Sequence, residues 1–563
     1  MEDTNRPSRT EDFTTPPDLR VQRGTGPVRR REPIYLNTIP PCNHACPAGE
    51  NIQGWLDQAQ AGNFREAWEI LVRDNPLPAV HGRVCYHPCE SSCNRADVDE
   101  AVSIHAVERF LGDLALKEGW QTRPYAEPSG KKILVIGAGP SGLSAAWHLA
   151  LKGHTVEIRE AGPMAGGMMR FGIPAYRMPR DVLDAEIANI EALGVTIRLN
   201  TKVEDVLAAK EEGGFDAVFM AIGAHLAKRV DIPAREAGKI MDALGYLKSV
   251  EAGEAPKLGR RVAIYGGGNT AMDAARTARR MGADEAMIIY RRDRDHMPAH
   301  PFEADEAESE GIKINWLRTI RQIDETEFQV EVMEVDENGR PQPTGKIETL
   351  QADSLLLALG QNVDTSVLEA IPGIEIEDHV VRVTDDMMTG AEGVFAGGDM
   401  VPSERTVAIA TGHGKNAARH IDAWLRGETY HKEKPAPRVH FKDLNLGYFT
   451  AFQKSRQDCL PAESRTRDFS EITAGLEREG AVYEASRCYS CGNCFECDGC
   501  FGSCPERAIS KLGPGNGYEI DYDLCTGCEA CVSQCPSNAM AMVRVGEGAR
   551  RRIAIAEQGG NAE

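Results

Sequence analysis

The chain has 563 residues, 42% of them hydrophobic, and its 64 basic and 85 acidic side chains give a formal net charge of −21. This length is too great for one core and predicts about three to four domains, while the acidic balance argues against a nucleic-acid partner. Sixteen cysteines behind a polar start without an export signal favour a reducing cytoplasm, and the longest uncharged apolar stretch, 133–151, contains glycines and a proline that make it a poor membrane span.

The first part of the chain predicts a tail followed by a helical domain that is rich in thiols. Residues 1–32 are polar, with several Pro and Arg, and predict a flexible tail. Residues 33–128 predict helices, and their cysteines form one C-x3-C-P group and one C-x3-C-x3-C group. These cysteines are Cys42, Cys46, Cys85, Cys89 and Cys93. The histidines beside them are more often helix or loop residues than metal ligands.

The next segment predicts a dinucleotide-binding unit. The stretch KKILVIGAGPSGLSAAWHLALKGHTVEIREA predicts a buried strand, a glycine turn, a helix and a second strand. The glycine positions of G-x-G-x-x-G and the start of the helix are occupied by Gly137, Gly139, Gly142, Pro140 and Ser141. Such a turn brings backbone N–H groups and the helix dipole to a pyrophosphate. Glu160 ends the second strand, where an acid can accept the ribose hydroxyls.

A second unit of the same kind begins at residue 261, in RVAIYGGGNTAMDAARTARRMGADEAMIIYRRD. Its turn and helix start are formed by Gly266, Gly268, Asn269, Thr270 and Ala271, with alanine in place of the third glycine. Its second strand ends in Arg291 and Arg292, where the first unit has an acid. A guanidinium suits a 2′-phosphate that a carboxylate would repel, so we expect NADP(H) here. NAD(H), with both arginines simply solvated, is the alternative.

Shorter signals follow these two units. The stretches 218–224 and 355–361 each predict a buried strand that runs into a glycine turn, and 394–400 predicts another strand, which ends in Gly397-Gly398-Asp399. A helix is expected from Thr406 onward. Residues 429–484 predict a connector with few long apolar runs, and residues 547–563 predict a second mobile tail.

The last predicted domain, 485–546, contains the pattern C-x2-C-x2-C-x3-C-P twice. This is the ligand set of a two-cluster bacterial ferredoxin, in which three thiolates hold one 4Fe-4S cluster and the fourth reaches across to the other. A disulfide framework or zinc sites would space their cysteines differently. The expected ligand sets are Cys494, Cys497, Cys500 with Cys535, and Cys525, Cys528, Cys531 with Cys504. One-electron transfer is therefore the first function to test.

The two dinucleotide units resemble the two-dinucleotide-binding-domain flavoprotein family, over about residues 131–426. The resemblance implies a discontinuous FAD domain, 129–240 and 376–428, with the NAD(P) domain, 241–375, inserted in it. It also implies that Asp399 hydrogen-bonds the FAD ribityl chain and that the flavin site includes Gly166, Gly167, Met168, Arg177, Gly398 and Thr406. Because no cysteine pair lies between Cys93 and Cys459, thiol chemistry beside the flavin is not expected.

With its N-terminal cysteines, the chain is similar to the small (beta) subunit of NADPH-dependent glutamate synthase and to the N-terminal third of dihydropyrimidine dehydrogenase. The phrases GRVCYHPCESSC, AVSIHAVERF, GGMMRFGIPAYRMPRDVL and YRRDRDHMP carry this likeness. The family's C-x2-C element is absent before Cys42, but Cys488-x2-Cys491 resembles it from the other end of the chain. We therefore hypothesise one cluster on Cys42, Cys93, Cys488 and Cys491. A second would use Cys46, Cys85, Cys89 and, by family position, Glu108. The alternatives are that Cys488 and Cys491 are spare thiols or that the N-terminal cysteines hold a single cluster.

The expected architecture is α/β: a helical iron-sulfur domain, two Rossmann-like dinucleotide-binding domains and a C-terminal α+β ferredoxin-like domain. The expected function is an oxidoreductase subunit that moves electrons between NADP(H), FAD and the clusters. Its partner would be a 2-oxoacid oxidoreductase, a glutamate synthase large subunit or a ferredoxin. The alternatives are the small subunit of glutamate synthase itself and, in another class, a redox-sensing or structural subunit. No catalytic acid or base is expected, and the chain is expected in the cytoplasm.

Overall fold

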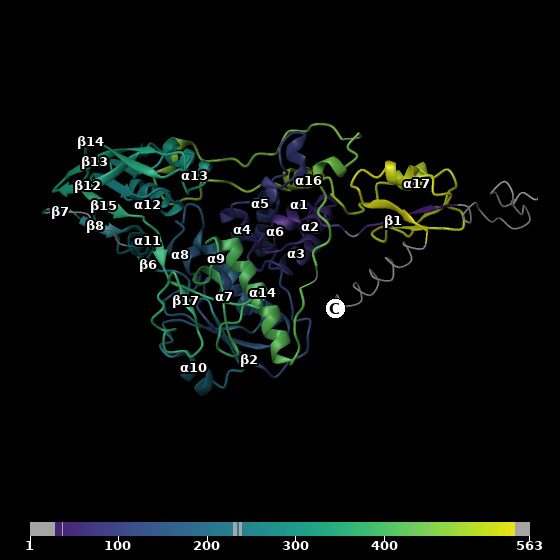
Figure 1. The fold of residues 1–563 in the computed structure, drawn as a ribbon, viewed down its shortest axis with the longest axis horizontal. Helices are drawn as coiled ribbons and strands as arrows, with labels where there is room; N and C mark the ends of the chain where they lie inside the picture. The colour runs from purple at the N-terminus through teal and green to yellow at the C-terminus, as the bar shows by residue number, and fades with distance from the viewer. Residues whose placement is uncertain are drawn as a thin grey trace, which may run out of the picture.

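The computed structural model describes residues 29–545, except 37, 229–233, 236–238, 433 and 448. The predicted tail at 547–563 lies outside the described residues, and so does most of the tail at 1–32. Figure 1 shows a block of helices between a small C-terminal module, marked by α17, and the two parts of the molecule that are built on sheets. Within the described residues, no helix has the length and apolar character needed to cross a membrane.

The helical block forms because amphipathic helices bury their apolar faces against one another. Trp55, Leu71 and Leu111 are fully buried in its core. Ala485, which the sequence analysis assigns to the start of the ferredoxin-like domain, lies in this core instead, because its helix packs on two of the N-terminal helices. The helices are α1 (Pro41–Ala45), α2 (Ile52–Gln60), α3 (Phe64–Val72), α4 (Pro78–Val84), α5 (Pro88–Ser91), α6 (Ile104–Glu118) and α16 (Arg478–Ser486).

The first sheet has five parallel strands in the order β19-β5-β2-β3-β4. Its central strands are apolar on both faces, as parallel strands covered by helices are. Two helices, α7 and α14, pack on each other beside it, and Gly414 lets them approach closely. The elements are β2 (Lys132–Ile136), α7 (Pro140–Leu151), β3 (Thr155–Arg159), α8 (Met168–Phe171), α9 (Arg180–Glu191), β4 (Thr196–Arg198), α10 (Val206–Gly213), β5 (Ala217–Met220), β19 (Val394–Ala396) and α14 (Val407–Leu425).

The second sheet lies between β5 and β19 in the sequence and has five parallel strands in the order β11-β10-β9-β15-β8. Its elements are β8 (Lys239–Asp242), α11 (Ala243–Glu251), β9 (Arg261–Tyr265), α12 (Asn269–Arg280), β10 (Glu285–Tyr290), α13 (Pro301–Ser309), β11 (Lys313–Trp316) and β15 (Ser354–Leu357). A further sheet, which the sequence did not indicate, joins β12 (Arg318–Asp324), β13 (Glu327–Val335) and β14 (Pro341–Gln351) to the short strand β7 (Ala234–Arg235). The short strands β6 (Leu226–Ala227) and β16 (Gln361–Asn362) pair where the chain passes between the two parallel sheets.

The C-terminal module differs from the expected domain division at one strand. Its strand β22 (Met540–Arg544) pairs antiparallel with β1 (Arg31–Tyr35), from the opposite end of the chain. Figure 1 shows β1 running through the module. The sequence analysis assigns residues 31–32 to a flexible tail and 33–35 to the helical domain. All five belong to this sheet instead, because β22 would otherwise expose an unpaired edge. The module also contains α17 (Gly499–Ser503), β20 (Ile509–Lys511), β21 (Tyr518–Ile520) and α18 (Ala530–Ser533).

A buried carboxyl group joins the helical block to the first sheet domain. Glu186 of α9 accepts hydrogen bonds from the backbone N–H groups of Ala79 at 2.7 Å and Val80 at 3.0 Å. These are orphan N–H groups in the first turn of α4. Glu186 is only 2% exposed, and burial raises the pKa of its carboxyl from 4.5 to about 8.

This raised pKa predicts a pH-dependent stability. Between pH 4.5 and 8 the folded protein holds a proton on Glu186 that the unfolded chain has lost, so the free energy of unfolding should fall by about 1.4 kcal/mol per pH unit as the pH rises toward the folded pKa. Glu186→Gln cannot titrate. We expect the melting temperature of the variant, relative to that of the native chain, to increase as the pH rises to about 8. Above that pH the difference between the two melting temperatures should stay constant. The exposed Glu191→Gln is the matched control, and a Glu186→Gln difference that is independent of pH would contradict the assignment.

Candidate cofactor and electron-transfer sites

One cavity of about 1870 Å³ lies between the two parallel sheets and is lined by residues of both. It receives the glycine turns that follow β2 and β9 and the turn that follows β19. Most of the sequence-predicted cofactor residues line it: Gly137, Gly139, Pro140, Ser141, Glu160, Gly167, Met168, Arg177, Gly266, Gly268, Asn269, Thr270, Arg291, Arg292, Gly398, Asp399 and Thr406. The predicted residues Gly142, Gly166 and Ala271 lie outside this lining.

The turn after β2 has the shape that a pyrophosphate requires. Gly137 has a φ of +104°, and a Cβ there would lie 2.4 Å from the carbonyl oxygen of Ala221. A Cβ on Gly139 would meet only Gly167, at 4.0 Å, so this backbone is open to the cavity. In the first turn of α7, the buried Ser141 Oγ has no hydrogen-bond partner among the described residues. An open backbone, an orphan hydroxyl and a helix N-terminus together fit a phosphate group.

Glu160 is held at the edge of the same cavity. Its Oε2 accepts a hydrogen bond from the Ala138 N–H at 2.8 Å, and its Oε1 accepts one from the Gly162 N–H, also at 2.8 Å. These two bonds fix the carboxylate immediately after β3 (Thr155–Arg159). Each oxygen keeps a further lone pair, so the carboxylate can still accept ribose hydroxyls.

Asp399 and the start of α14 form another side of the cavity. Asp399 lies in a short 3-10 turn, Gly398–Met400, and burial raises the pKa of its carboxyl to about 6 although Arg405 opposes this shift. Thr406 caps α14 by accepting a hydrogen bond from the Ile409 N–H at 3.2 Å. The N-terminus of this 19-residue helix therefore faces the cavity with its positive dipole. A polar, partly anionic group such as a flavin pyrimidine ring would be stabilised there.

The turn after β9 repeats this design in the second sheet. Gly266 has a φ of +147°, and a Cβ on Gly268 would meet no atom within 4 Å. Arg291 and Arg292 follow β10 and line the cavity. Arg292 Nε is buried and has no hydrogen-bond partner among the described residues. The donor set fits a phosphorylated ribose.

Arg177 lines the cavity, as expected, but its positive charge is paired with carboxylates of the second sheet domain. Its guanidinium pairs with Asp273 at 2.9 Å and with Glu303 at 2.6 Å, both in the second sheet domain. It therefore ties the two sheet domains together. Val84 and Tyr86 also line the cavity, and sequence reasoning missed both. Their only signal was their position on either side of Cys85.

The first N-terminal thiol group comes from both ends of the chain, as hypothesised. Cys42, Cys93, Cys488 and Cys491 lie close enough that the pKa of Cys42 is raised by burial and by the other three thiols. Backbone and side-chain N–H groups point at the sulfurs: Ser490 N donates to Cys488 Sγ at 3.4 Å, and Asn94 Nδ2 donates to Cys491 Sγ at 3.5 Å. Buried thiols surrounded by N–H donors suit a metal cluster, which stabilises thiolates.

The second N-terminal group consists of Cys46, Cys85, Cys89 and Glu108. Burial raises the pKa of all four, and each of the three thiols has Glu108 among its charged neighbours. Asn75 Nδ2 donates a hydrogen bond to Glu108 Oε1 at 2.9 Å and to Glu50 Oε1 at 3.1 Å. Glu50, a second buried carboxyl beside this group, was not predicted from the sequence.

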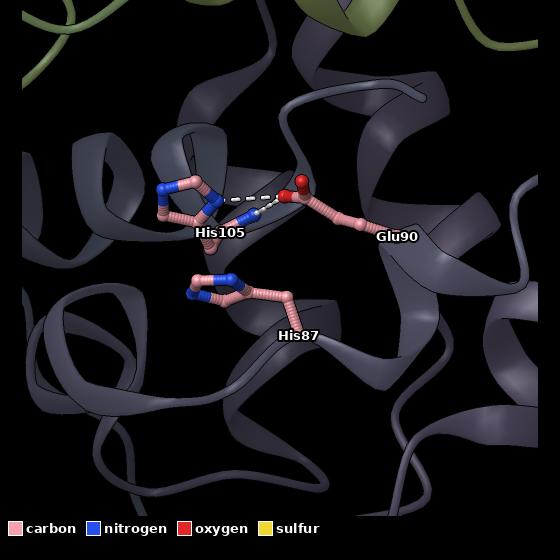
Figure 2. Close-up of side chains that lie close together, drawn as sticks. All are labelled: His87, Glu90 and His105. Atoms are coloured by element: carbon pink, nitrogen blue, oxygen red, sulfur yellow. Dashed lines mark hydrogen bonds and ion pairs between the residues drawn. The ribbon is translucent and has the colours of Figure 1, made fainter. Parts of the chain in front are cut away.

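Three side chains beside this group, His87, Glu90 and His105, lie close together, and hydrogen bonds join His105 to Glu90 (Figure 2). The two imidazole rings stack with their centroids 3.9 Å apart. His105 Nδ1 bonds Glu90 Oε1 at 2.6 Å, and its Nε2 bonds Gln457 Oε1 at 2.9 Å. The second Glu90 oxygen accepts from Lys454 Nζ at 3.1 Å. Because Gln457 and Lys454 belong to the connector, these contacts fix the connector to the helical block.

The eight cysteines of the C-terminal module gather in the two groups that the spacing predicts. The pKa of Cys494 is raised by burial and then by Cys500, Cys535 and Cys497, and that of Cys525 by burial and then by Cys504 and Cys528. Cys531 is close to both Cys525 and Cys504. The backbone N–H groups of Ala508 and Ala539 donate to Cys504 and Cys535, each at 3.2 Å. Such N–H···S bonds are typical of cluster loops.

The fold and these sites define a class of protein: a pyridine-nucleotide-dependent flavoprotein oxidoreductase that carries iron-sulfur domains. Residues 131–414 match the family described as pyridine nucleotide-disulphide oxidoreductase. Residues 37–120 match dihydropyrimidine dehydrogenase domain II, 4Fe-4S cluster, and residues 518–541 match a 4Fe-4S binding domain. The chain belongs to the pyridine nucleotide-disulphide oxidoreductase family, and the resemblance to glutamate synthase small subunits is confirmed.

Several curated relatives align with most of this chain. The chain is 37% identical over 495 residues to the NADP(+)-dependent formate dehydrogenase subunit beta of Moorella thermoacetica, covering 80% of this chain and 70% of that protein. It is 33% identical over 499 residues to the NADPH-Fe(3+) oxidoreductase subunit beta of Geobacter sulfurreducens, covering 80% and 74%. It is 31% identical over 425 residues to the glutamate synthase [NADPH] small chain of Azospirillum brasilense, covering 69% and 87%.

Proposed function

We propose that this chain is the electron-transfer subunit of a larger oxidoreductase, and that it moves electrons between NADP(H), FAD and four 4Fe-4S clusters. The observation that carries this proposal is the single cavity onto which both glycine turns open. Two dinucleotides held there by Gly139 and Gly268 would meet in one shared cavity. FAD can accept a hydride from a nicotinamide and release the two electrons singly.

Different side chains bind different groups of FAD and NADP(H). Ser141 and the N-terminus of α7 hold the FAD pyrophosphate, Glu160 its ribose, and Asp399 its ribityl chain. Asn269 and the N-terminus of α12 hold the NADP(H) pyrophosphate. Arg291 and Arg292 bind its 2′-phosphate. The buried Arg292 Nε, which has no partner among the described residues, supports this assignment.

The cysteine groups follow one another from the cavity to the C-terminal module. Val84 and Tyr86 line the cavity, and Cys85 between them belongs to the second group, so that group borders the flavin site. Cys93 of the first group follows Cys89 by four residues, and Cys491 precedes Cys494 by three residues. We therefore assign the second group to the side of the flavin, the first group to the middle and the ferredoxin-like module to the partner side.

The partner is proposed to supply the chemistry of the second substrate. Three relatives are named as a subunit or a chain of a larger enzyme, which supports a partner subunit. A redox enzyme such as a formate or 2-oxoacid oxidoreductase, or a free ferredoxin, fits the exposed cysteine loops of the module, in which Cys494, Cys497 and Cys528 are exposed. The second candidate, a glutamate synthase small chain, is favoured by the likeness to the Azospirillum protein. NADPH oxidation that depends on glutamine and 2-oxoglutarate, with the neighbouring gene product added, would select that candidate.

Iron analysis tests the cofactor content. Four clusters of four irons predict about sixteen iron atoms per FAD in anaerobically reconstituted protein. A value of about eight would leave only the ferredoxin pair and would contradict the N-terminal groups. Reduction of a viologen dye by NADPH is expected from the same preparation. Tightly bound FAD that NADPH reduces without passing electrons to the dye would instead support a sensing or structural subunit.

A further inference from the structure

Tyr86 faces a different domain from the cysteines on either side of it. The thiols of Cys85 and Cys89 lie in the second N-terminal group, beside Glu108. The phenol ring of Tyr86 instead lines the cavity and reaches the second sheet domain. One short loop therefore carries the cysteines of a cluster site on one side and a contact with the nucleotide-binding domain on the other.

The contacts of Tyr86 are made with the residues that begin α12 (Asn269–Arg280) and α13 (Pro301–Ser309). Asn269 Nδ2 donates a hydrogen bond to Tyr86 Oη at 2.5 Å, and Asn269 Oδ1 accepts one from the His300 N–H at 3.2 Å. The His300 ring stacks on the Tyr86 ring, with centroids 3.7 Å apart and planes 19° apart. Tyr86 Oη also lies 3.5 Å from Glu303 Oε1, to which it donates. Asn269 follows Gly268 directly, so these contacts end on the nucleotide-binding turn itself.

We propose that Tyr86 is a positioning residue: its stack with His300 and its bond to Asn269 hold the nucleotide-binding turn at a fixed distance from the loop that carries Cys85 and Cys89. This inference rests on the function proposed above. Hydride transfer requires reacting atoms about 3–3.5 Å apart, and a shift of about 1 Å can cost about 100-fold in rate. Arg177 joins the same two sheet domains through its ion pairs, and its guanidinium also interacts with the Tyr86 hydroxyl. Tyr86 itself bonds Asn269 and so links the nucleotide turn to that loop.

The test is rapid mixing of NADPH with full-length, cofactor-loaded Tyr86→Ala, followed by flavin absorbance. We expect the limiting rate of flavin reduction to fall about 10- to 100-fold, while the apparent dissociation constant for NADPH changes by less than about threefold. Tyr86→Phe keeps the stacked ring and should recover most of the rate. Tyr125→Ala, at a tyrosine that is 66% exposed, is the matched control and should reduce at the native rate.

His300→Ala removes the other half of the stack at a position far from the cysteines in the sequence. It should slow flavin reduction as Tyr86→Ala does. The double variant should be no more than about twofold slower than Tyr86→Ala, because both substitutions remove the same contact. Native rates in both single variants, or independent, multiplying effects in the double variant, would overturn the proposal. If Tyr86→Ala loses iron, His300→Ala decides alone: slowed reduction supports the proposal and a native rate overturns it. Failure of NADPH to reduce the native protein would instead refute the proposed function.

Discussion

Cys491→Ala should separate flavin reduction from reduction of the C-terminal clusters. Cys491 belongs to the thiol group that connects the helical block to the ferredoxin-like module. Even outer-shell partners of a metal contribute about 10- to 100-fold to its affinity, so loss of a direct ligand should abolish one cluster and remove about four iron atoms per FAD. NADPH should still bleach the flavin at the native rate. The C-terminal clusters should become reduced far more slowly, as measured by rapid freezing and electron paramagnetic resonance.

Cys459→Ala is the control for this variant, because Cys459 is exposed and its thiol bonds, within the described part of the chain, to Thr473 and Gln457. It should keep the native iron content and both rates. A Cys491→Ala protein with native iron content, or with unchanged reduction of the C-terminal clusters, would show that Cys491 is a spare thiol. The same result would indicate that the N-terminal cysteines hold a single cluster.

The double variant Arg291→Ala/Arg292→Ala should lose its preference for NADPH. Each charge-assisted hydrogen bond to a phosphate contributes about 1.5–3 kcal/mol. Loss of both should lower kcat/KM for NADPH by about 100-fold or more, since about 1.4 kcal/mol corresponds to a factor of ten. The value for NADH should stay within about twofold, because NADH has no 2′-phosphate to lose.

Arg294→Ala is the matched control for this pair. Arg294 lies two residues further along and forms ion pairs with Asp305 and Glu308, and it does not line the cavity. Its nucleotide preference should be native. Equal losses for NADPH and NADH in the double variant would refute the 2′-phosphate role of the arginine pair.

Local patterns predicted much of the fold. The turns around Gly137 and Gly266 followed from their glycine spacing, because only glycine allows their positive φ values and the close carbonyl contacts behind them. The grouping of the C-terminal cysteines also followed from spacing. The association of Cys488 and Cys491 with Cys42 and Cys93 needed the family resemblance, since no local rule joins residues more than 390 positions apart.

The remaining features depend on how distant segments meet. Nothing in Arg31–Tyr35 indicates that its partner is Met540–Arg544, because strand pairing leaves no mark on one strand alone. Tyr86 has no sequence signal beyond its place beside Cys85, and its role depends on how the second sheet domain packs against the cysteine loop. Arg177 was placed at the flavin, but its ion pairs with Asp273 and Glu303 cross between domains. Such contacts become visible only in the folded chain.

The central claim is that electrons pass between the pyridine nucleotide and the iron-sulfur groups through the flavin. An anaerobic titration with NADPH, followed by visible absorbance and electron paramagnetic resonance on the same samples, tests it most directly. We predict that the flavin absorbance falls and that signals of reduced 4Fe-4S clusters rise in the same titration. Flavin that bleaches while the clusters stay oxidised would contradict the claim, as would a preparation that contains no flavin or iron.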